Sequence, residues 1–444
     1  MDRNRITLLL SFAVALVLGG CREDFSKSVY IPKDLQGMDL NDTVSEYCFE
    51  RSVSTADLIV FWEKGFGPDV SKAPDYKGHK MTANLDNLLQ QSQYFYDFFK
   101  DTLHFITPGS AADSLKMMIM LRYDDEGTAY GGDYDEKIGA LWVTPLRTQD
   151  ERMNCIAHEL GHSFQSQLAI DNNSGFGGGG IYEMTSQWML WQVNPLWVED
   201  EEYHWDAFMK QTHLAFMHPE NMYHSPYVLE YWSEKYGKQF IAELWRSARK
   251  RHDVVAVYEE MQGIDDAVFG QEMLDAARHF MTYDMPRVRN VMKPYANRHS
   301  STLLPADEDG WQRIADDRIP QQYGYNGISL TIPDAGKTVT VSVKGLFNPG
   351  RITYAESDEY VRNAAWSFGL VGVKHDGSCI YSETAVSTIG HEGKVSITAP
   401  LGEPLSYLWL VVVPTPKKHS DVLEEDAGAC INYPYSVKSL SPLR

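Results

Sequence analysis

Blocks of apolar residues in the first third of the chain predict a small mixed sheet and a helix. Leu58–Trp62, Lys116–Arg122 and Ile138–Thr144 are short apolar runs of the kind that form buried strands. Asn84–Leu103 instead carries its apolar and aromatic residues at helical spacing. A polar segment rich in Asp, Gly and Tyr, Tyr123–Lys137, separates the last two predicted strands and predicts a loop.

The middle of the chain, from about residue 205 to residue 295, has a helical pattern. Its apolar positions predict helices over Trp205–Phe216, Tyr227–Tyr236, Phe240–Arg251 and Gly270–Tyr283. Several histidines lie in or near this region, and each alone is more typical of packing or surface positions than of a metal site.

The pattern changes after Arg298, where a polar connector begins and short strand signals follow it. Asp376-Gly377 is a hairpin signal between two of these strands. Regularly spaced short strands predict a β-sandwich. The predicted strands are Ile328–Ile332, Thr338–Val343, Phe368–Val373, Val395–Thr398 and Leu408–Val413. The whole chain is therefore predicted to be α+β, with a sheet-and-helix domain at 57–298 and a connector plus all-β domain at 299–444.

Residues 158–162 read His-Glu-Leu-Gly-His, which is an HExxH motif. Positions four apart lie on one face of a helix, so His158 and His162 can bind one metal ion. Glu159 lies beside them, where its carboxylate can take a proton from the attacking water. Thr148 and Glu151 have capping-box spacing and predict where this helix begins. The pattern favours zinc-dependent hydrolysis.

A third ligand is predicted on the next helix. Four glycines, Gly177 to Gly180, end the motif helix, and Ile181–Trp191 is a second helical segment with Glu183 near its start. Two imidazoles and one carboxylate with an open fourth position are typical of catalytic zinc. The alternative for Glu183 is a solvated carboxylate that interacts with the helix dipole.

An HExxH helix, a loop of this length and a glutamate on the following helix resemble the gluzincin branch of the zincin metallopeptidases. The resemblance implies that His158, His162 and Glu183 bind Zn²⁺ and that Glu159 is the general base. It also implies a zincin-like domain, and the chain is similar to an uncharacterised family of secreted proteins with a C-terminal β domain. Gln187 departs from the pattern, because related enzymes carry Asp there as partner of a zinc histidine.

The group that stabilises the oxyanion is left open by the sequence. His224 and Tyr227 are candidates because they begin the helix after the Glu183 segment, and Tyr223 and Tyr231 compete with them. In gluzincins, an edge strand that precedes the metal helix binds extended substrate by pairing with its backbone. The resemblance implies this role for Ile138–Thr144, which precedes the predicted metal helix along the chain. An ordinary sheet strand is an equal alternative for that segment.

The N-terminus predicts export. Residues 1–20 combine a basic start with a short apolar run and resemble a lipoprotein signal peptide. Cys21 would be lipidated, and residues 21–56 would form a tether and entry segment. The acidic residues that follow Cys21 resemble a surface-export tag, which predicts a lipid anchor in the outer membrane facing the cell surface. The remaining cysteines allow three pairings, of which a Cys379–Cys430 disulfide is the one to test first.

Composition narrows the class of protein. The chain has 444 residues, 43% of them hydrophobic, and a formal net charge of −21. Such a charge excludes nucleic acid as the expected partner, because phosphate binding needs a basic patch. The sequence favours a surface-anchored zinc peptidase acting on extended peptides or glycoproteins. The alternative is a non-catalytic surface lipoprotein that binds glycan or protein on a degenerate zincin scaffold. Neither reading indicates an oligomeric state.

Overall fold

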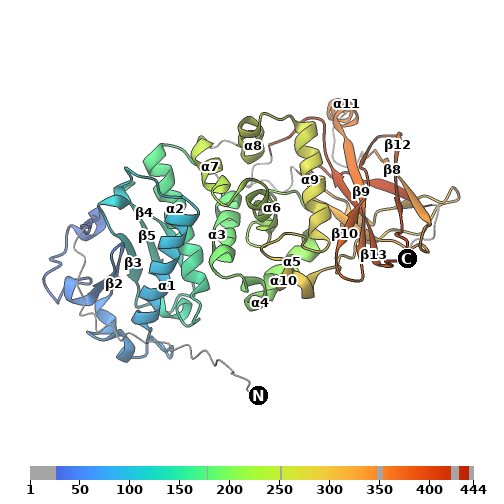
Figure 1. Cartoon of the computed structure of the whole chain (residues 1–444). Coiled ribbons are helices and arrows are strands. Elements are labelled where there is room, and N and C mark those ends of the chain that lie inside the picture. Colours follow the sequence, from blue (N-terminus) through green and yellow to red (C-terminus); the bar gives the residue numbers. More distant parts are fainter. Residues whose placement is uncertain (1–26, 178, 251–252, 348–353, 422–429, 440–444) are drawn as a thin grey trace, which may run out of the picture.

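The computed structural model describes residues 27–177, 179–250, 253–347, 354–421 and 430–439. The predicted signal peptide and Cys21 lie outside these residues. Within them, none of the helices combines the length and apolarity needed to cross a membrane. Figure 1 shows a small sheet at one end, helices in the middle and a second β region at the other end.

The N-terminal sheet is mixed, as predicted, and has the order β1-β2-β3-β5-β4. β2, β3 and β5 are parallel, and β1 and β4 pair antiparallel to them at the edges. Nearly every residue of the three parallel strands is buried, which explains their continuous apolar runs. The strands are β1 Ser52–Ser54, β2 Leu58–Trp62, β3 Met117–Leu121, β4 Tyr130–Tyr134 and β5 Ile138–Val143.

Of the two alternatives for Ile138–Thr144, the ordinary sheet strand is correct and the edge strand is not. β5 lies between β3 and β4, and β4 is the edge strand. The segment Tyr123–Lys137, predicted as a loop, contains β4. Its sequence Tyr-Gly-Gly-Asp-Tyr has no apolar alternation, so only pairing with β5 makes it a strand.

Helices α1 (Leu85–Asp97), α2 (Asn154–Asn172) and α3 (Gly179–Val193) follow the sheet, and α2 contacts β4, β5 and α3. The capping box predicted at Thr148 does not open α2. The helix begins at Asn154 after Met153, which has a left-handed backbone, and Asp150 accepts a hydrogen bond from the Asn154 N–H at 3.0 Å. A 3-10 turn over Pro145–Arg147 precedes this start and displaces it along the chain.

The middle of the molecule is helical, and its core is aromatic. Five tryptophans there are fully buried: Trp188, Trp191, Trp197, Trp232 and Trp245. The helices are α4 Trp197–Asp200, α5 Glu202–Gln211, α6 Tyr227–Tyr236, α7 Phe240–Ser247, α8 Val254–Gln262, α9 Asp266–Phe280 and α10 Arg289–Met292. α6 matches its predicted bounds, and the other predicted helices begin or end a few residues away.

The C-terminal region holds two further sheets around one apolar core, as predicted for a sandwich. One has the order β10-β9-β13-β7 with β11 on β9, and the other has the order β12-β8-β14-β6. The predicted hairpin joins β9 to β10, and Gly377 takes a φ of 86° there. The elements are β6 Gln312–Arg313, β7 Asn326–Ser329, β8 Thr338–Gly345, α11 Tyr354–Asn363, β9 Ala365–Lys374, β10 Cys379–Tyr381, β11 Ala385–Thr388, β12 Glu392–Thr398, β13 Leu405–Pro414 and β14 Tyr435–Ser439.

Strand β13 serves two cores because successive side chains point to opposite faces of a sheet. Leu408, Leu410 and Val412 pack into the sandwich. Trp409, Val411 and Val413 pack instead into the large core that contains the helices and the N-terminal sheet. Helix α9 lies against this second face in Figure 1. The β region is therefore joined to the helices by a continuous apolar core.

The predicted Cys379–Cys430 disulfide does not form. Cys379 keeps a free thiol, and its sulfur lies 3.2 Å from the Thr282 hydroxyl. β10 places Cys379 against the helical region, which sequence spacing alone does not reveal.

Candidate metal site

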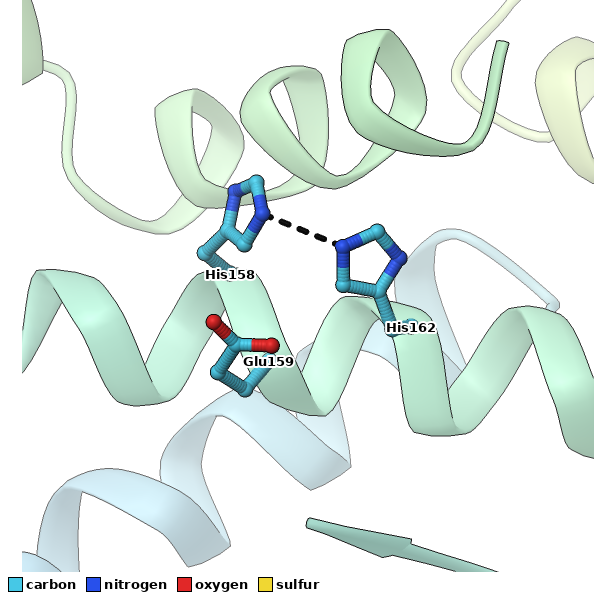
Figure 2. Close-up of side chains that lie close together, drawn as sticks. All are labelled: His158, Glu159 and His162. Atoms are coloured by element: carbon cyan, nitrogen blue, oxygen red, sulfur yellow. Dashed lines mark hydrogen bonds between the residues drawn. The ribbon is translucent and has the colours of Figure 1, made fainter. Parts of the chain in front are cut away.

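Helices α2 and α3 bring the three predicted ligands together. Nε2 of His158 lies 3.0 Å from Oε2 of Glu183, and Nε2 of His162 lies 3.2 Å from the same oxygen. The two Nε2 atoms are 3.1 Å apart. Figure 2 shows both imidazoles on the same side of α2 and joined by this contact. Residues separated by a glycine-rich loop thus meet at one point.

The spacing of these three atoms fits a zinc ion. Separations of 3.0–3.2 Å let one ion lie within coordination distance of all three atoms. Imidazole nitrogen and carboxylate oxygen are both common zinc ligands. The three residues also line the cleft described below. His158, His162 and Glu183 therefore form a cluster that can hold a zinc ion.

The charges of the cluster respond to one another. Burial by itself would raise the pKa of Glu183, but its hydrogen bonds to His158 and His162 outweigh burial and lower the pKa. Burial by itself would lower the pKa of His158, and the contacts with Glu183 and Glu159 raise it instead. Imidazole nitrogens and a carboxylate oxygen at this separation are atoms that a divalent cation can bind together.

Glu159 is buried beside the two histidines, with its side chain leaving α2 next to His158 (Figure 2). Ligand atoms of Glu159, His158 and His162 all lie within 4.8 Å of one another. Burial raises the pKa of Glu159, against the lowering effect of the two imidazoles and the Gly131 backbone. A carboxylate with a raised pKa next to a metal site suits acceptance and return of a proton.

Two glutamines hold the ligand histidines from behind. His158 donates from Nδ1 to Oε1 of Gln187 at 2.8 Å, and His162 donates from Nδ1 to Oε1 of Gln165 at 3.2 Å. The Gln165 amide is fixed by bonds to the Tyr182 carbonyl and the Ser186 hydroxyl, both at 3.0 Å. Because Oε1 only accepts, each histidine keeps its proton on Nδ1 and presents the Nε2 lone pair to the metal position.

The cluster lies in an open cleft of about 630 Å³. Its walls come from β4 and the segment before it, from α2 and α3, and from α5 with the segment before α6. Lining residues include Thr128, Ala129, Tyr130, Gly131, Arg147, Cys155, Glu201, Tyr203, His204 and Tyr223. The edge strand β4 thus borders the metal position directly.

Of the tyrosines that the sequence offers as oxyanion donors, Tyr223 is the one that lines the cleft. Its ring is parallel to that of His158 within 28°, with the centroids 6.2 Å apart. Burial and the nearby Glu183 charge raise the pKa of Tyr223 to about 12. The phenol therefore stays protonated at neutral pH and can donate a hydrogen bond.

The other candidate donors lie elsewhere. Tyr227 is fully buried between Trp191 and Phe208 in the aromatic core and does not line the cleft. Tyr231 donates to Asp275 at 2.5 Å. His224 contacts His204 through their Nδ1 atoms at 2.7 Å, one step behind the cleft wall. The prediction that Tyr227 or His224 is the oxyanion donor is therefore corrected, because neither side chain lines the cleft, whereas Tyr223 does.

Gln165 is a site residue that sequence reasoning missed. It lies three residues after His162, so helical spacing alone places it near that ligand. Sequence reasoning does not find Gly131 either, because the composition of its segment predicts a loop, whereas the structure has strand β4 there. A side-chain carbon at Gly131 would stand 1.9 Å from the Glu159 carbonyl oxygen, so the strand crosses α2 here only as glycine.

The chain belongs to a protein family of unknown function, DUF6055, whose sequence model matches residues 21–441. No curated protein matches the chain.

Similar solved structures are carbohydrate-binding modules. One is the C-terminal family 22 carbohydrate binding module of Clostridium thermocellum Xyn10B, with 10% identity, 32% of this chain and 78% of that chain covered, and a TM-score of 0.19. Another is the CBM22-2 xylan-binding domain of Paenibacillus barcinonensis Xyn10C, with 16% identity, 32% of this chain and 86% of that chain covered, and a TM-score of 0.20. These scores are too low to support an argument about fold or function.

Proposed function

We propose that this protein is a zinc-dependent peptidase of the gluzincin type that cuts extended peptide segments of extracellular proteins or glycoproteins. The observation that carries the proposal is the triangle of His158, His162 and Glu183 atoms, 3.0–3.2 Å on each side, with Glu159 next to it. This ligand set with an open fourth position is the arrangement of hydrolytic zinc sites.

The residues have distinct roles in this proposal. A bound zinc ion would polarise the scissile carbonyl and activate the attacking water. His158, His162 and Glu183 hold the ion, and Gln187 and Gln165 orient the two imidazoles. Glu159 takes the proton of the water and passes it to the leaving amine, for which its raised pKa is suited.

Strand β4 and Tyr223 would handle the substrate. β4 is an edge strand, so its outer backbone groups can pair with an extended peptide. The cleft lies against Tyr130 and Gly131 of this strand, next to Glu159. Tyr223 would donate its hydroxyl hydrogen to the carbonyl oxygen as negative charge develops there.

The proposal includes a location. Lipidation at Cys21 would anchor the chain in the outer membrane, facing the outside of the cell, with substrate reaching the cleft from there. In the producing cells, Cys21→Ser should move the protein from the membrane fraction to the soluble fraction. An unchanged membrane fraction would count against the anchor.

The decisive experiment compares wild type with Glu159→Gln. Purified wild type should carry about one zinc per chain and cut members of an unbiased peptide library. Glu159→Gln should keep the zinc and lose hydrolysis by about a thousandfold or more, because the proton acceptor is gone. Metal analysis and mass spectrometry of the digests provide the two readouts.

Gln149→Ala serves as control, because Gln149 contacts the Thr82 and Pro145 carbonyls outside the cleft. The control variant should keep both zinc and hydrolysis. Wild type without zinc, or equal cutting by Glu159→Gln, would reject the peptidase and return the question to the non-catalytic binding alternative.

A further inference from the structure

We propose that Arg147 binds a carboxylate of the substrate in the cleft that contains His158, His162 and Glu183. The site would then select peptides that place an acidic side chain or a free C-terminal carboxylate near the bond to be cut. This inference rests on the proposed peptidase function and adds the chemical class of its substrate.

Arg147 is the only Lys or Arg side chain among the described residues that line the cleft. Three carboxylates line it as well, those of Glu159, Glu183 and Glu201. The chain has 61 acidic and 40 basic residues, so a basic side chain in a cleft lined by carboxylates stands against the overall charge of the protein. The charged group that a substrate can pair with is one that has no partner within the protein.

The carboxylates are already engaged. Glu183 is held by the two ligand histidines. Glu201 accepts hydrogen bonds from Trp197 Nε1 at 2.8 Å and Asn154 Nδ2 at 3.2 Å, and it lies 3.5 Å from His204 Nε2. Glu159 is buried beside the two histidines. Glu183 and Glu201 therefore already have partners, and Glu159 is largely covered.

Arg147 differs from them. Its Nε donates to the Gly127 carbonyl, and it has no ion pair with any carboxylate of the residues that the structure describes. A guanidinium carries five N–H groups, so four remain to donate. The backbone beneath it is fixed, because Arg147 closes the 3-10 turn and the next residue, Thr148, is buried. The Arg147 side chain is exposed, and its Nε is held by the hydrogen bond to Gly127.

Arg147 lines the same cleft as the proposed metal ligands. Cys155, Glu201 and Tyr203 line it as well. Cys155 lies on α2 about one helical turn before His158. A peptide that fills the cleft would therefore pass both the histidines and the Arg147 side chain.

The chemistry of arginine favours a carboxylate. Its planar fork matches the two carboxylate oxygens and forms paired, charge-assisted hydrogen bonds. A carboxylate entering the cleft meets an arginine that has no ion pair among the described residues. A lysine or arginine side chain would be repelled by Arg147 and would meet Glu201, whose oxygens already have partners.

The test measures peptide binding without turnover. The probes are acetylated six-residue alanine peptides with a Glu, Gln or Lys scanned through each position, with a free or an amidated C-terminus. They bind to zinc-loaded full-length chain carrying Glu159→Gln, alone or together with Arg147→Gln, Arg147→Lys or Arg147→Glu. Fluorescence anisotropy of labelled peptides gives the affinities, and circular dichroism with zinc content checks each variant's folding.

We expect one position, or the free terminus, to bind about tenfold or more tighter with the carboxylate than with its neutral amide. Arg147→Gln should remove that difference while leaving the affinity for the neutral peptide unchanged. Arg147→Glu should reverse the preference toward Lys, and Arg147→Lys should keep part of it. Free and amidated peptides separate a terminal carboxylate from a side-chain carboxylate.

Two results would overturn the inference: no difference between Glu and Gln peptides at any position or terminus, or an equal loss for charged and neutral peptides in Arg147→Gln. The second result would indicate that Arg147 merely braces the Gly127 segment. Failure of the peptidase is seen separately, because wild type would then cut no peptide even where Arg147-dependent binding persists.

Discussion

The imidazoles of His158 and His162 are each supported by a glutamine amide. Gln187 accepts from His158 and donates to the Tyr223 carbonyl at 2.8 Å. It therefore links a proposed zinc ligand to the segment that carries the proposed oxyanion donor. A neutral amide fixes the tautomer of the histidine without adding negative charge to the site.

Removal of the Gln187 amide should weaken metal binding. Gln187→Ala leaves the Nδ1 proton of His158 without its partner and releases the ring, so zinc affinity should fall about 10- to 100-fold. Competition with a chromogenic chelator measures this directly. Gln149→Ala should bind zinc like wild type, and an unchanged affinity in Gln187→Ala would show that the amide does not orient the ligand.

A second residue-scale prediction concerns pH and lies far from the metal. Burial, followed by the nearby Asp266 carboxylate, raises the pKa of Glu259 to about 7, and Asp253 adds to this while His419 opposes it. Since the folded pKa lies above the unfolded value, the protonated form stabilises the fold. That contribution is complete below about pH 4.3 and is lost as pH rises through about 7.

Glu259→Gln keeps the neutral form at every pH. It should therefore raise the thermal midpoint relative to wild type at pH 8, by about 1–2 °C, and leave it nearly unchanged at pH 4. Thermal unfolding followed by circular dichroism at both pH values provides the measurement. An equal shift at both pH values would assign the effect to packing rather than to ionisation.

At the scale of elements, the site depends on the crossing of strand β4 and helix α2. The edge strand passes so close to the helix that a Cβ at residue 131 would meet the Glu159 carbonyl carbon at 2.8 Å and the His162 Cβ at 2.8 Å. The same strand lines the cleft. Gly131 thus sets how closely strand β4 approaches helix α2.

Gly131→Ala should force β4 away from α2. We expect a loss of about 1–3 kcal/mol in the free energy of unfolding, because the added methyl group overlaps backbone atoms that have no room to move. Peptide hydrolysis should fall more than zinc content, since the ligands are on α2 and α3. Denaturant unfolding and metal analysis measure the two effects.

Gly132→Ala is the matched control, because nothing lies within 4 Å of an added Cβ there. The control variant should unfold like wild type. Equal behaviour of the two variants would show that the crossing tolerates a side chain.

At the scale of the whole molecule, the β region completes the core of the helical region. Val371, Val373, Trp409, Val411 and Val413 belong to the large apolar core. Polar contacts accompany them: Gln271 donates to Ser367 at 2.7 Å, and Trp409 donates to Asn297 at 3.0 Å. Near residue 298 the chain changes from mainly helices to mainly strands. The large apolar core nevertheless contains residues from both sides of this point.

A chain ending at residue 298 should fail to fold as a soluble monomer. The cut exposes the face of α9 and its neighbours that the β region covers, and contiguous apolar surface of this kind leads to aggregation. Size-exclusion chromatography and thermal unfolding compare residues 57–298 with residues 27–444. If residues 57–298 form a soluble monomer with a sharp unfolding transition, this expectation is contradicted.

The sequence determined the local features of this protein. The parallel strands of the N-terminal sheet could be predicted because they are buried on both faces and read as unbroken apolar runs. His158, Glu159 and His162 could be predicted because a helix converts a spacing of four residues into proximity. Helix α6 was predicted from its pattern for the same reason.

Only the tertiary structure decided the features that depend on distant segments. β4 is a strand because β5 pairs with it, α2 begins where a preceding turn and Asp150 cap it, and Cys379 faces Thr282. The choice of Tyr223 over Tyr227 depended on which side of a turn faces the cleft. Strand pairing, helix capping and the direction in which a side chain points all depend on contacts between segments that are distant along the chain. The pattern of apolar and polar residues does not specify those contacts.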